Sequence, residues 1–515
     1  MRTSRESLSE LVTALPLPLA VTGILWGTSA NPVTAGQGVL SFLIALITWM
    51  SYRRWARSSR HEVPLFPLIC TAYWIAYGVP LFWGDPMLMT ASGPRYPSQE
   101  TRTLAMLVAV LGVSALGLGL SIGTASLYVP KSTLVAQRLG GSRWYLYILV
   151  ALGTVLNFFS GSAYVFGEGM RQAILIGSNT VPVVAFCMLF RSYMRGEHHP
   201  LDKIVIAIYC LSRGIAGISS GWLATAASLV LIILIMLWQA GRRFRALPLL
   251  SLGLFVLFFQ ASKDEFRRQY WYSSYESSTL ERVSYWTEQS AVTWHDALTD
   301  SSGNRARELA YRSLRRFDLL GQTANVLDLT PDTVPYQYGK LYSYLWVTLV
   351  PRLLWPNKPS MSEANRFYQV EYGLTAERDL EGVSIAVGVL AESYINFGWF
   401  GVFGVMFLIG AALDLFRRVL LAPNAGEFLN CLGLAMVPTL VIVESQLAGY
   451  FGGTIQTIVL TMVMFFPVLS FVKRDQVAVG RSRGPARSGL IRRGLVPNTN
   501  QVASPSRAGN IVTPR

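Results

Sequence analysis

Residues 103–128 read TLAMLVAVLGVSALGLGLSIGTASLY, an apolar run without a charged residue. A bilayer core needs about 20 such residues for one helix, so this run predicts a transmembrane helix. Comparable runs recur along the chain and bring the expected number of spans to about twelve. The predicted spans are 11–29, 36–52, 63–83, 103–128, 144–162, 170–190, 203–219, 222–240, 246–262, 396–416, 428–447 and 453–472. We therefore expect an all-α, polytopic integral membrane protein.

The composition supports this fold class. Of the 515 residues, 52% are hydrophobic and 14% are charged, whereas soluble domains contain about 25% charged residues. A soluble globular protein, a disordered chain and a disulfide-stapled secreted domain are all disfavoured. The four cysteines lie inside apolar runs without metal-ligand spacing, so we expect them to be small core residues.

The formal net charge of +15 follows from the topology that we predict. If both termini lie in the cytoplasm, most Lys and Arg residues fall in cytoplasmic segments, as membrane proteins prefer. Anionic lipid headgroups then account for the charge, and no nucleic-acid partner is needed. Arg2 and Arg5 precede the first apolar run, so a cleaved signal peptide is the alternative for that span.

The predicted organisation has four parts. They are a membrane domain with spans one to nine (1–262), a large external loop (263–395), a membrane domain with spans ten to twelve (396–472) and a basic, disordered cytoplasmic tail (473–515). Long connections in compact proteins are usually functional. The external loop is therefore where we expect a site.

The first piece of this loop predicts a helix that begins after a turn at 301–303 and ends at Thr330-Pro331. Arginines recur along it at spacings of three and four, which places them on one face. The members of this face are Arg305, Glu308, Arg312, Arg315 and Arg316. Two interpretations remain open: a solvated face with Glu308 and Arg312 paired, or an anion-binding stripe.

The second piece, residues 341–359, is apolar but short and is interrupted by three prolines. It predicts a re-entrant segment with Arg352 inside the apolar run. A cation at such depth is costly and is usually functional or paired, and guanidinium suits phosphate because its planar fork binds two oxygens. Lys358 adds a second cation, and an arginine that snorkels to the headgroups is the alternative.

In the third piece, Ser384, Gly388, Glu392 and Asn396 recur every four residues and would share one face of a helix. Gly388 would leave a gap for a ligand, and Glu392 would act as a general base. An amphipathic helix lying in the membrane interface is the alternative. Arg213, inside predicted span seven, would face the same lipid cavity or pair with Glu444.

Residues 316–410 resemble the bacterial oligosaccharide repeat-unit polymerases of O-antigen and exopolysaccharide synthesis. The resemblance is carried by five motifs. They are Arg316-Phe-Asp318-Leu-Leu, Pro335-Tyr-x-Tyr-Gly-Lys-x-Tyr342, Pro351-Arg-Leu-Leu-Trp-Pro-Asn-Lys-Pro359, Asn365 with Tyr372-Gly373, and Glu392-Ser-Tyr-Ile-Asn-Phe-Gly-Trp-Phe-Gly401. Asn357 and Val383 depart from the family pattern, which often has Asp and Thr there.

The resemblance implies a metal-independent glycosyltransferase without a cofactor, in the bacterial plasma (inner) membrane. Such enzymes transfer a growing glycan from its polyprenyl pyrophosphate carrier to the next lipid-linked repeat unit on the outer face. A chain-length regulator and a flippase would be the protein partners, and membrane lipids would surround the chain. The product would be O-antigen, capsule or exopolysaccharide.

Leaving-group charge requires preorganised cations, and the acceptor hydroxyl requires a base. Arg352, Lys358, Arg312 and Arg316 are the expected cations. Glu392 is the first candidate for the base, followed by Asp318 and His295. Asn365, Tyr372, Ser384 and Asn396 are expected to contact sugars. An O-antigen-type ligase, a transporter or flippase of lipid-linked oligosaccharide, and an envelope scaffold are the competing hypotheses.

Overall fold

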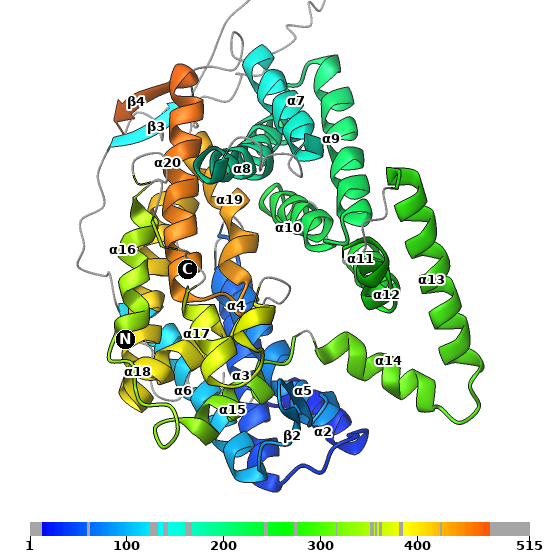
Figure 1. Cartoon of the computed structure of the whole chain (residues 1–515). Helices are drawn as coiled ribbons and strands as arrows, with labels where there is room; N and C mark the ends of the chain where they lie inside the picture. The colour runs from blue at the N-terminus through cyan, green and yellow to red at the C-terminus, as the bar shows by residue number, and fades with distance from the viewer. Residues whose placement is uncertain are drawn as a thin grey trace, which may run out of the picture.

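The fold is known from a computed structural model. We describe residues 13–58, 62–122, 132–136, 143–159, 167–241, 246–271, 277–315, 317–350, 355, 358–359, 363–380, 385–422 and 425–473. Helices dominate this part of the chain, as expected for an all-α protein (Figure 1). The basic tail that we predict beyond residue 473 lies outside the described residues, as does the start of the first predicted span.

The first half of the chain contains mainly long helices. They are α2 (Pro16–Gly27), α3 (Ala35–Arg57), α4 (Leu65–Tyr73), η1 (Trp74–Gly78), α5 (Pro80–Trp83), α6 (Gln99–Ile122), α7 (Arg143–Phe159), α8 (Gly167–Met194), α9 (Pro200–Ser219), α10 (Ala224–Gln239) and α11 (Ala246–Gln260). Strands β1 (Leu88–Thr90) and β2 (Gly93–Arg95) form a short antiparallel hairpin before α6.

The second half alternates short and long helices. They are α12 (Lys263–Tyr270), α13 (Thr279–Thr299), α14 (Asn304–Arg315), α15 (Leu319–Leu329), η3 (Lys340–Tyr342), α16 (Ser343–Leu349), α17 (Glu363–Glu371), η4 (Glu377–Asp379), α18 (Gly388–Phe416), η5 (Arg417–Leu421), α19 (Glu427–Val441), η6 (Ala448–Gly452), α20 (Gly453–Phe465) and η7 (Phe466–Val468). Strand β4 (Leu469–Lys473) pairs antiparallel with β3 (Ser132–Ala136).

Six helical stretches in the described ranges are long and apolar enough to cross a membrane. They are Ala35–Arg57, Leu65–Trp83, Gln99–Ile122, Ile174–Met194, Gly388–Leu421 and Ala448–Val468. The other six predicted spans coincide with helices that are shorter or carry more charge, such as α9 with Arg213 and Asp202. The protein is therefore a helical membrane protein, while twelve spans and cytoplasmic termini stay predictions.

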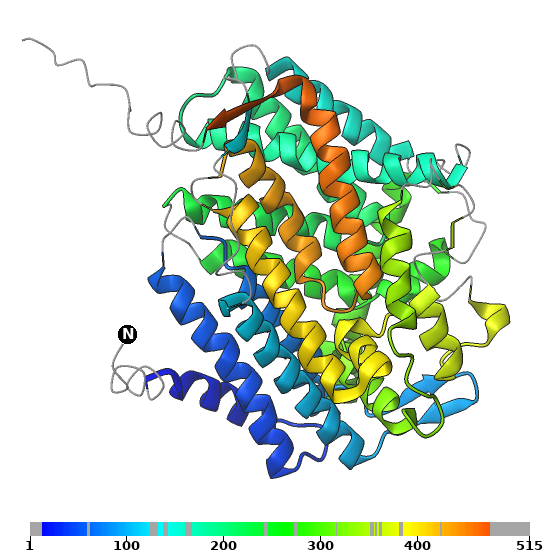
Figure 2. The same ribbon diagram turned by 90° about the vertical axis from the view of Figure 1, so that its left-hand side faces the viewer.

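Helices α6 and α18 pack along each other (Figure 2). Glycines make this approach possible: a Cβ at Gly119 would collide with the Phe407 carbonyl, and one at Gly410 with the Leu116 carbonyl. Small residues allow membrane helices to bring their backbones together in this way.

Helix α18 is a helical hairpin, because its direction reverses at Phe397 (φ −141°, ψ 16°) and Gly398 (φ 60°, ψ −145°). The positive φ favours glycine at this position. Leu390 and Met406 lie on opposite sides of the bend, yet both reach the space beside Gly112. In a straight helix they would be about 24 Å apart, so the arm 388–397 folds back along 399–416.

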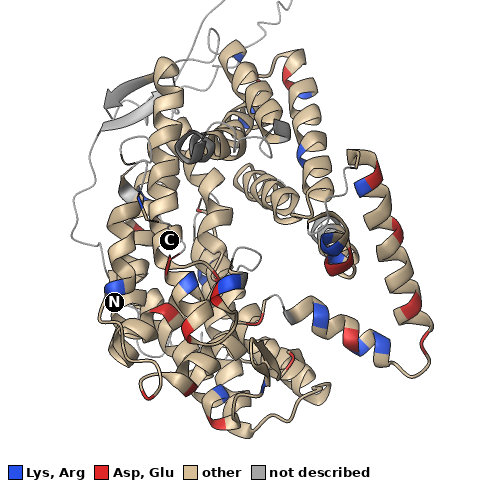
Figure 3. Ribbon diagram, in the orientation of Figure 1, with Lys and Arg blue, Asp and Glu red and all other residues tan. Residues whose placement is uncertain are grey.

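The predicted external loop divides into two structurally different parts. Residues 263–315 form α12–α14 and pack with α9 and α11 in small separate cores, one of which contains Phe259, Phe266 and Trp286. Residues 319–397 instead join the main core; Leu320, Ala324 and Tyr368 belong to it. Charged residues are frequent on α12–α14, whereas α10, α19 and α20 carry few (Figure 3).

The helix predicted to run from residue 304 to Thr330 is two helices, because Asp318 starts a new one. Its side chain accepts a hydrogen bond from Gly321 N at 3.0 Å and caps α15. The predicted turn at 301–303 is confirmed, with Gly303 at φ 69°, and Thr330 is the C-cap at the predicted end. The amphipathic interfacial helix is not observed, since every residue from 388 to 396 is buried.

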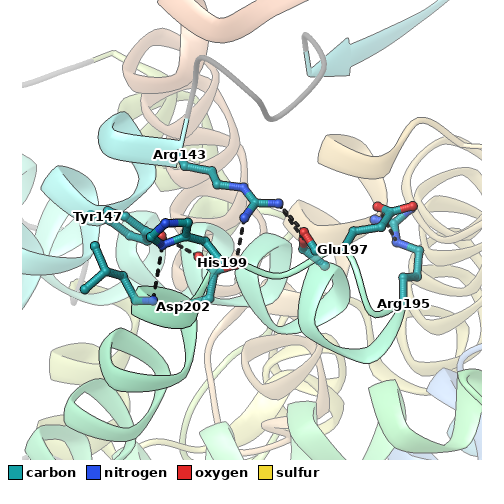
Figure 4. A network of polar contacts seen from close by, with 8 residues as sticks. Arg143, Tyr147, Arg195, Glu197, His199 and Asp202 are labelled. Carbon is teal, nitrogen blue, oxygen red and sulfur yellow. Dashed lines mark hydrogen bonds and ion pairs between the residues drawn. The ribbon is translucent and has the colours of Figure 1, made fainter.

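A polar network ties α7 to the turn between α8 and α9 (Figure 4). Asp202 is fully buried and accepts hydrogen bonds from Tyr147 Oη at 2.5 Å and His199 N at 2.9 Å. Arg143 pairs with Asp202 at 3.4 Å and also donates to the Glu197 carbonyl. These contacts supply hydrogen-bond partners to backbone groups at the helix ends, so the network has a structural role.

Candidate functional site

Glu392 lies in the first arm of the α18 hairpin and is completely buried. One carboxylate oxygen, Oε2, accepts a hydrogen bond from Leu447 N at 2.6 Å. The other oxygen, Oε1, is buried and has no hydrogen-bond partner among the residues that the structure describes. No Lys or Arg in the described ranges forms an ion pair with it. A buried carboxylate with an unused oxygen is costly, which makes it a candidate for chemistry or binding.

The segment around Leu447 is a break between two helices. Helix α19 ends at Val441 and η6 begins at Ala448, so residues 442–447 belong to neither helix. The predicted span 428–447 therefore ends six residues early. The free backbone N–H of Leu447 becomes available to Glu392 because of this break.

Gly388 begins the arm that carries Glu392, at φ 78°. A Cβ at this position would lie 2.9 Å from the Val443 carbonyl and 3.2 Å from Leu319 Cδ1. The gap that we predict at Gly388 is therefore filled by the helix break and by α15. It offers no room for a ligand, and the glycine is needed for close packing.

Tyr342 and Asn396 hold the hairpin against η3. Tyr342 Oη donates to Ser393 Oγ at 3.2 Å, and burial together with the nearby Glu392 raises the pKa of Tyr342. Asn396 Nδ2 donates to the Glu392 carbonyl at 2.9 Å, and its Oδ1 accepts from Gly339 N at 3.0 Å. Asn396 shares the face of Glu392 as predicted, but its amide is occupied by backbone groups.

Lys358 is buried and lies at the end of α16. Its Nζ donates to the Val350 carbonyl at 2.8 Å and to the Val347 carbonyl at 3.4 Å. A lysine is well suited to this place because the last carbonyls of a helix lack partners. These contacts give Lys358 a capping role, and substrate binding by Lys358 stays a prediction.

Residues 447–456, at and after the end of the helix break, lie next to both predicted motifs, the one with Glu392 and the one with Arg352. Glu392 binds Leu447 N, and Gln456 Nε2 donates to the Thr348 carbonyl just before the motif that contains Arg352. A Cβ on Gly452 would collide with Thr348, so α16 and η6 are in close contact. Residues 447–456 therefore contact both the Glu392 arm and the helix that leads into residues 351–359.

Asn365 and Tyr372 lie on or beside α17. Asn365 N donates to Gln446 Oε1 at 3.0 Å, and Asn365 Oδ1 is buried without a partner. The hydroxyl of Tyr372 shares a hydrogen bond with Thr330 Oγ1 at 2.5 Å, and burial raises the pKa of Tyr372 to about 12. Asn365 has a free acceptor, whereas the hydroxyl of Tyr372 is committed to Thr330.

Asp318 is half-buried, and its cap on α15 occupies one oxygen. Burial raises the pKa of Asp318 to about 6, although the Gly321 N–H and the Arg102 guanidinium both oppose this shift. A carboxyl that titrates near neutrality could serve as a base. The cap gives it a structural role as well.

Two arginines of the predicted stripe on α14, Arg305 and Arg312, are paired with acids. Arg312 pairs with Glu308 at 2.6 Å, as one interpretation predicts, and also with Glu265 of α12 at 3.6 Å. Arg305 pairs with Asp296 of α13 at 3.2 Å. Acids from α12 and α13, which the linear pattern could not place, therefore balance these two arginines.

Arg213 is buried in α9, where Nη1 donates to Asn179 Oδ1 at 3.1 Å and Nε has no partner. The alternative pair with Glu444 is not formed. Arg316, Arg352 and Ser384 lie outside the described residues, so their predicted roles stay predictions. His295 is exposed beside Asp296.

Groups that could hold a metal ion are absent: the part of the chain described contains no cluster of three His, Cys, Asp or Glu residues. Sequence reasoning missed two features of the site, the helix break at 442–447 and Arg102 at the start of α6. The polar run Glu444-Ser445-Gln446 inside an apolar stretch could have indicated the helix break. Arg102 resembled an ordinary charge flanking a span.

Comparison with known proteins gives one match. No curated protein and no solved structure matches the chain. Residues 112–420, more than half of the chain, match a family described as a domain of unknown function, DUF8712. This region contains α18 with Glu392 and the Arg352 motif but ends before the helix break. The chain therefore belongs to the DUF8712 family.

Proposed function

We propose that this protein is an integral-membrane glycosyltransferase. It polymerises polyprenyl-pyrophosphate-linked oligosaccharide repeat units on the outer face of the bacterial plasma membrane. The observation that carries the proposal is the carboxylate of Glu392. It is wholly buried, one oxygen is fixed by Leu447 N, and the other is unpartnered.

The reaction assigns one step to this carboxylate. The acceptor hydroxyl attacks the anomeric carbon of the donor, and its proton passes to Glu392 Oε1. The bond between that carbon and the pyrophosphate oxygen breaks, and the electron pair leaves with the lipid pyrophosphate. The Leu447 N–H fixes the carboxylate through Oε2, which preorganises the base.

The leaving pyrophosphate needs cations. Arg352 and Lys358 stand in the motif that begins where α16 ends. Helix α16 contacts η6, which begins directly after Leu447, the residue whose N–H binds Glu392. This shared neighbour supports one site built from both motifs. Lys358 contributes by holding α16, and Arg352 is the cation that we assign to the pyrophosphate.

Transport of lipid-linked oligosaccharide is the second candidate, and one observation favours it. Transporter sites are often built from interrupted helices, and the Glu392 arm and the break at 442–447 are two such interruptions in contact. A ligase would use the same donor chemistry with a different acceptor.

Deletion of the gene in its host, followed by complementation, tests the proposal. Wild-type protein should restore long glycan chains on a gel, Glu392→Gln should leave single repeat units, and Glu308→Gln should behave as wild type. Glutamine keeps the size and the bond from Leu447 N, while Glu308 is an exposed acid. Long chains with Glu392→Gln would overturn the proposal. Long unattached lipid-linked chains in the deletion would indicate a ligase, and precursor retained on the inner face a flippase.

A further inference from the structure

Arg102 is a buried arginine whose side chain has no partner in the part of the chain that the structure describes. It lies in the first turn of α6, only 6% of its surface is exposed, and its side chain makes no hydrogen bond or ion pair within the described ranges. Two other arginines at the ends of elements are paired: Arg95, the last residue of β2, pairs with Asp328, and Arg417, at the end of α18, pairs with Asp414 at 2.7 Å.

The position of Arg102 makes this lack of a partner more costly. Removing a guanidinium from water is unfavourable unless an anion or several acceptors replace the water. The beginning of a helix also carries partial positive charge, which disfavours a second cation there. The acid in the same turn, Glu100, is exposed. A bound anion at this position would offset both the lost hydration of the Arg102 guanidinium and its repulsion by the positive start of α6.

The neighbouring carboxylates do not supply that anion. The guanidinium of Arg102 lowers the pKa of Asp318, and Asp85 raises it. Arg102 nevertheless forms no ion pair with either acid. Asp318 uses Oδ1 to accept from Gly321 N and cap α15. The five guanidinium donors of Arg102 are left for another acceptor.

The surroundings connect this arginine to the candidate site. Helix α15, which Asp318 caps, packs against α6. The next residue, Leu319, lies against Gly388 at the start of the arm that carries Glu392. Arg102 and Glu392 therefore lie on two elements that both contact the start of α15.

We propose that Arg102 binds a phosphate-type oxyanion where α6 meets the start of α15. The anion is the diphosphate of the lipid-linked substrate, and this source rests on the proposed function. A guanidinium suits it because two parallel N–H groups can bind two phosphate oxygens. The backbone N–H groups at the start of α6 add positive potential.

Binding to the full-length protein in nanodiscs tests this proposal with two probes, inorganic pyrophosphate and farnesyl pyrophosphate. Arg102→Gln should weaken binding by about 10- to 100-fold, as expected for lost hydrogen bonds to a charged group. Arg95→Gln is the matched control, because Arg95 lies seven residues away in a half-exposed ion pair. Arg102→Lys keeps the charge but not the fork and should bind with intermediate affinity. Thermal unfolding of each variant confirms that it is folded.

Unchanged binding in folded Arg102→Gln, or no binding of either probe to the wild type, would overturn the proposal. Binding of farnesyl pyrophosphate alone indicates that the anion must be lipid-borne, and binding of both probes indicates that the diphosphate suffices. The two proposals fail separately. Loss of binding in Arg102→Gln, in a protein whose Glu392→Gln variant still extends glycans, would leave the anion site standing and remove the base.

Discussion

The two parts of the long segment between α11 and the α18 hairpin differ in how far their polar side chains are buried and paired. In residues 263–315, the charged side chains other than the buried Lys263 are mostly exposed or partly exposed, and several pair across α12, α13 and α14. In the described residues between 319 and 397, polar groups are buried within the main core. Four of their side-chain oxygens have no hydrogen-bond partner there: Asn325 Oδ1, Asn365 Oδ1, Gln369 Oε1 and Glu392 Oε1. Chemistry is expected in the second part, because unsatisfied buried groups are costly to keep.

Two aspartates show the contrast directly. Hydrogen bonds from Arg305 N and from Ser302 lower the pKa of Asp300, in the turn before α14, to about 2. Burial raises the pKa of Asp318 to about 6. The same residue type thus favours its charged form in one part and its neutral form in the other. The difference comes from the surroundings, and the spacing along the sequence does not reveal it.

The largest effect is expected from closing the space inside the hairpin. A Cβ at Gly401 would collide with the Ser393 carbonyl, whereas one at Gly404 meets nothing within 4 Å. Gly401→Ala should lower the free energy of unfolding by about 1–3 kcal/mol and abolish activity. Gly404→Ala, three residues along the same helix, should be as stable as wild type. Thermal unfolding in detergent micelles measures both.

Equal stability of the two alanine variants would contradict the hairpin, since only a reversed chain places Ser393 against Gly401.

The pH dependence of stability should differ in sign between the two aspartates. Folding raises the pKa of Asp318, so wild type should lose stability relative to Asp318→Asn as the pH rises from about 4 to about 6, by on the order of 2 kcal/mol. Asparagine retains the helix cap. For Asp300 the pKa is lowered, so wild type should gain stability relative to Asp300→Asn as the pH rises from about 2 to about 4.

Denaturant unfolding across this pH range supplies the measurement. If stability changed with pH in the same direction for both aspartates, burial would not be what distinguishes Asp318 from Asp300.

The smallest effect is expected on the exposed part. Removing the pair between Glu308 and Arg312 with Arg312→Gln should cost about 0.3–0.5 kcal/mol, because exposed helix pairs are weak. The loss should shrink further at high salt. Glycan extension should be unchanged. A marked loss of glycan extension in Arg312→Gln would instead support the interpretation of α14 as an anion-binding face.

Local patterns predicted several features. Residues 103–122 of the apolar run lie in α6, and Gly303 forms the predicted turn. The hairpin was not predictable from periodicity, because both arms are apolar and the bend depends on Gly398. The balance of the α14 arginines required acids from α12 and α13, which only tertiary packing brings near.

The most direct test of the central claim uses purified protein in nanodiscs with polyprenyl-pyrophosphate-linked repeat units as the only substrate. Wild type and Glu308→Gln should produce longer lipid-linked glycans and release polyprenyl pyrophosphate. Folded Glu392→Gln should extend them about 10²- to 10⁴-fold more slowly, as expected when a general base is removed. Extension at the wild-type rate by Glu392→Gln would contradict the account.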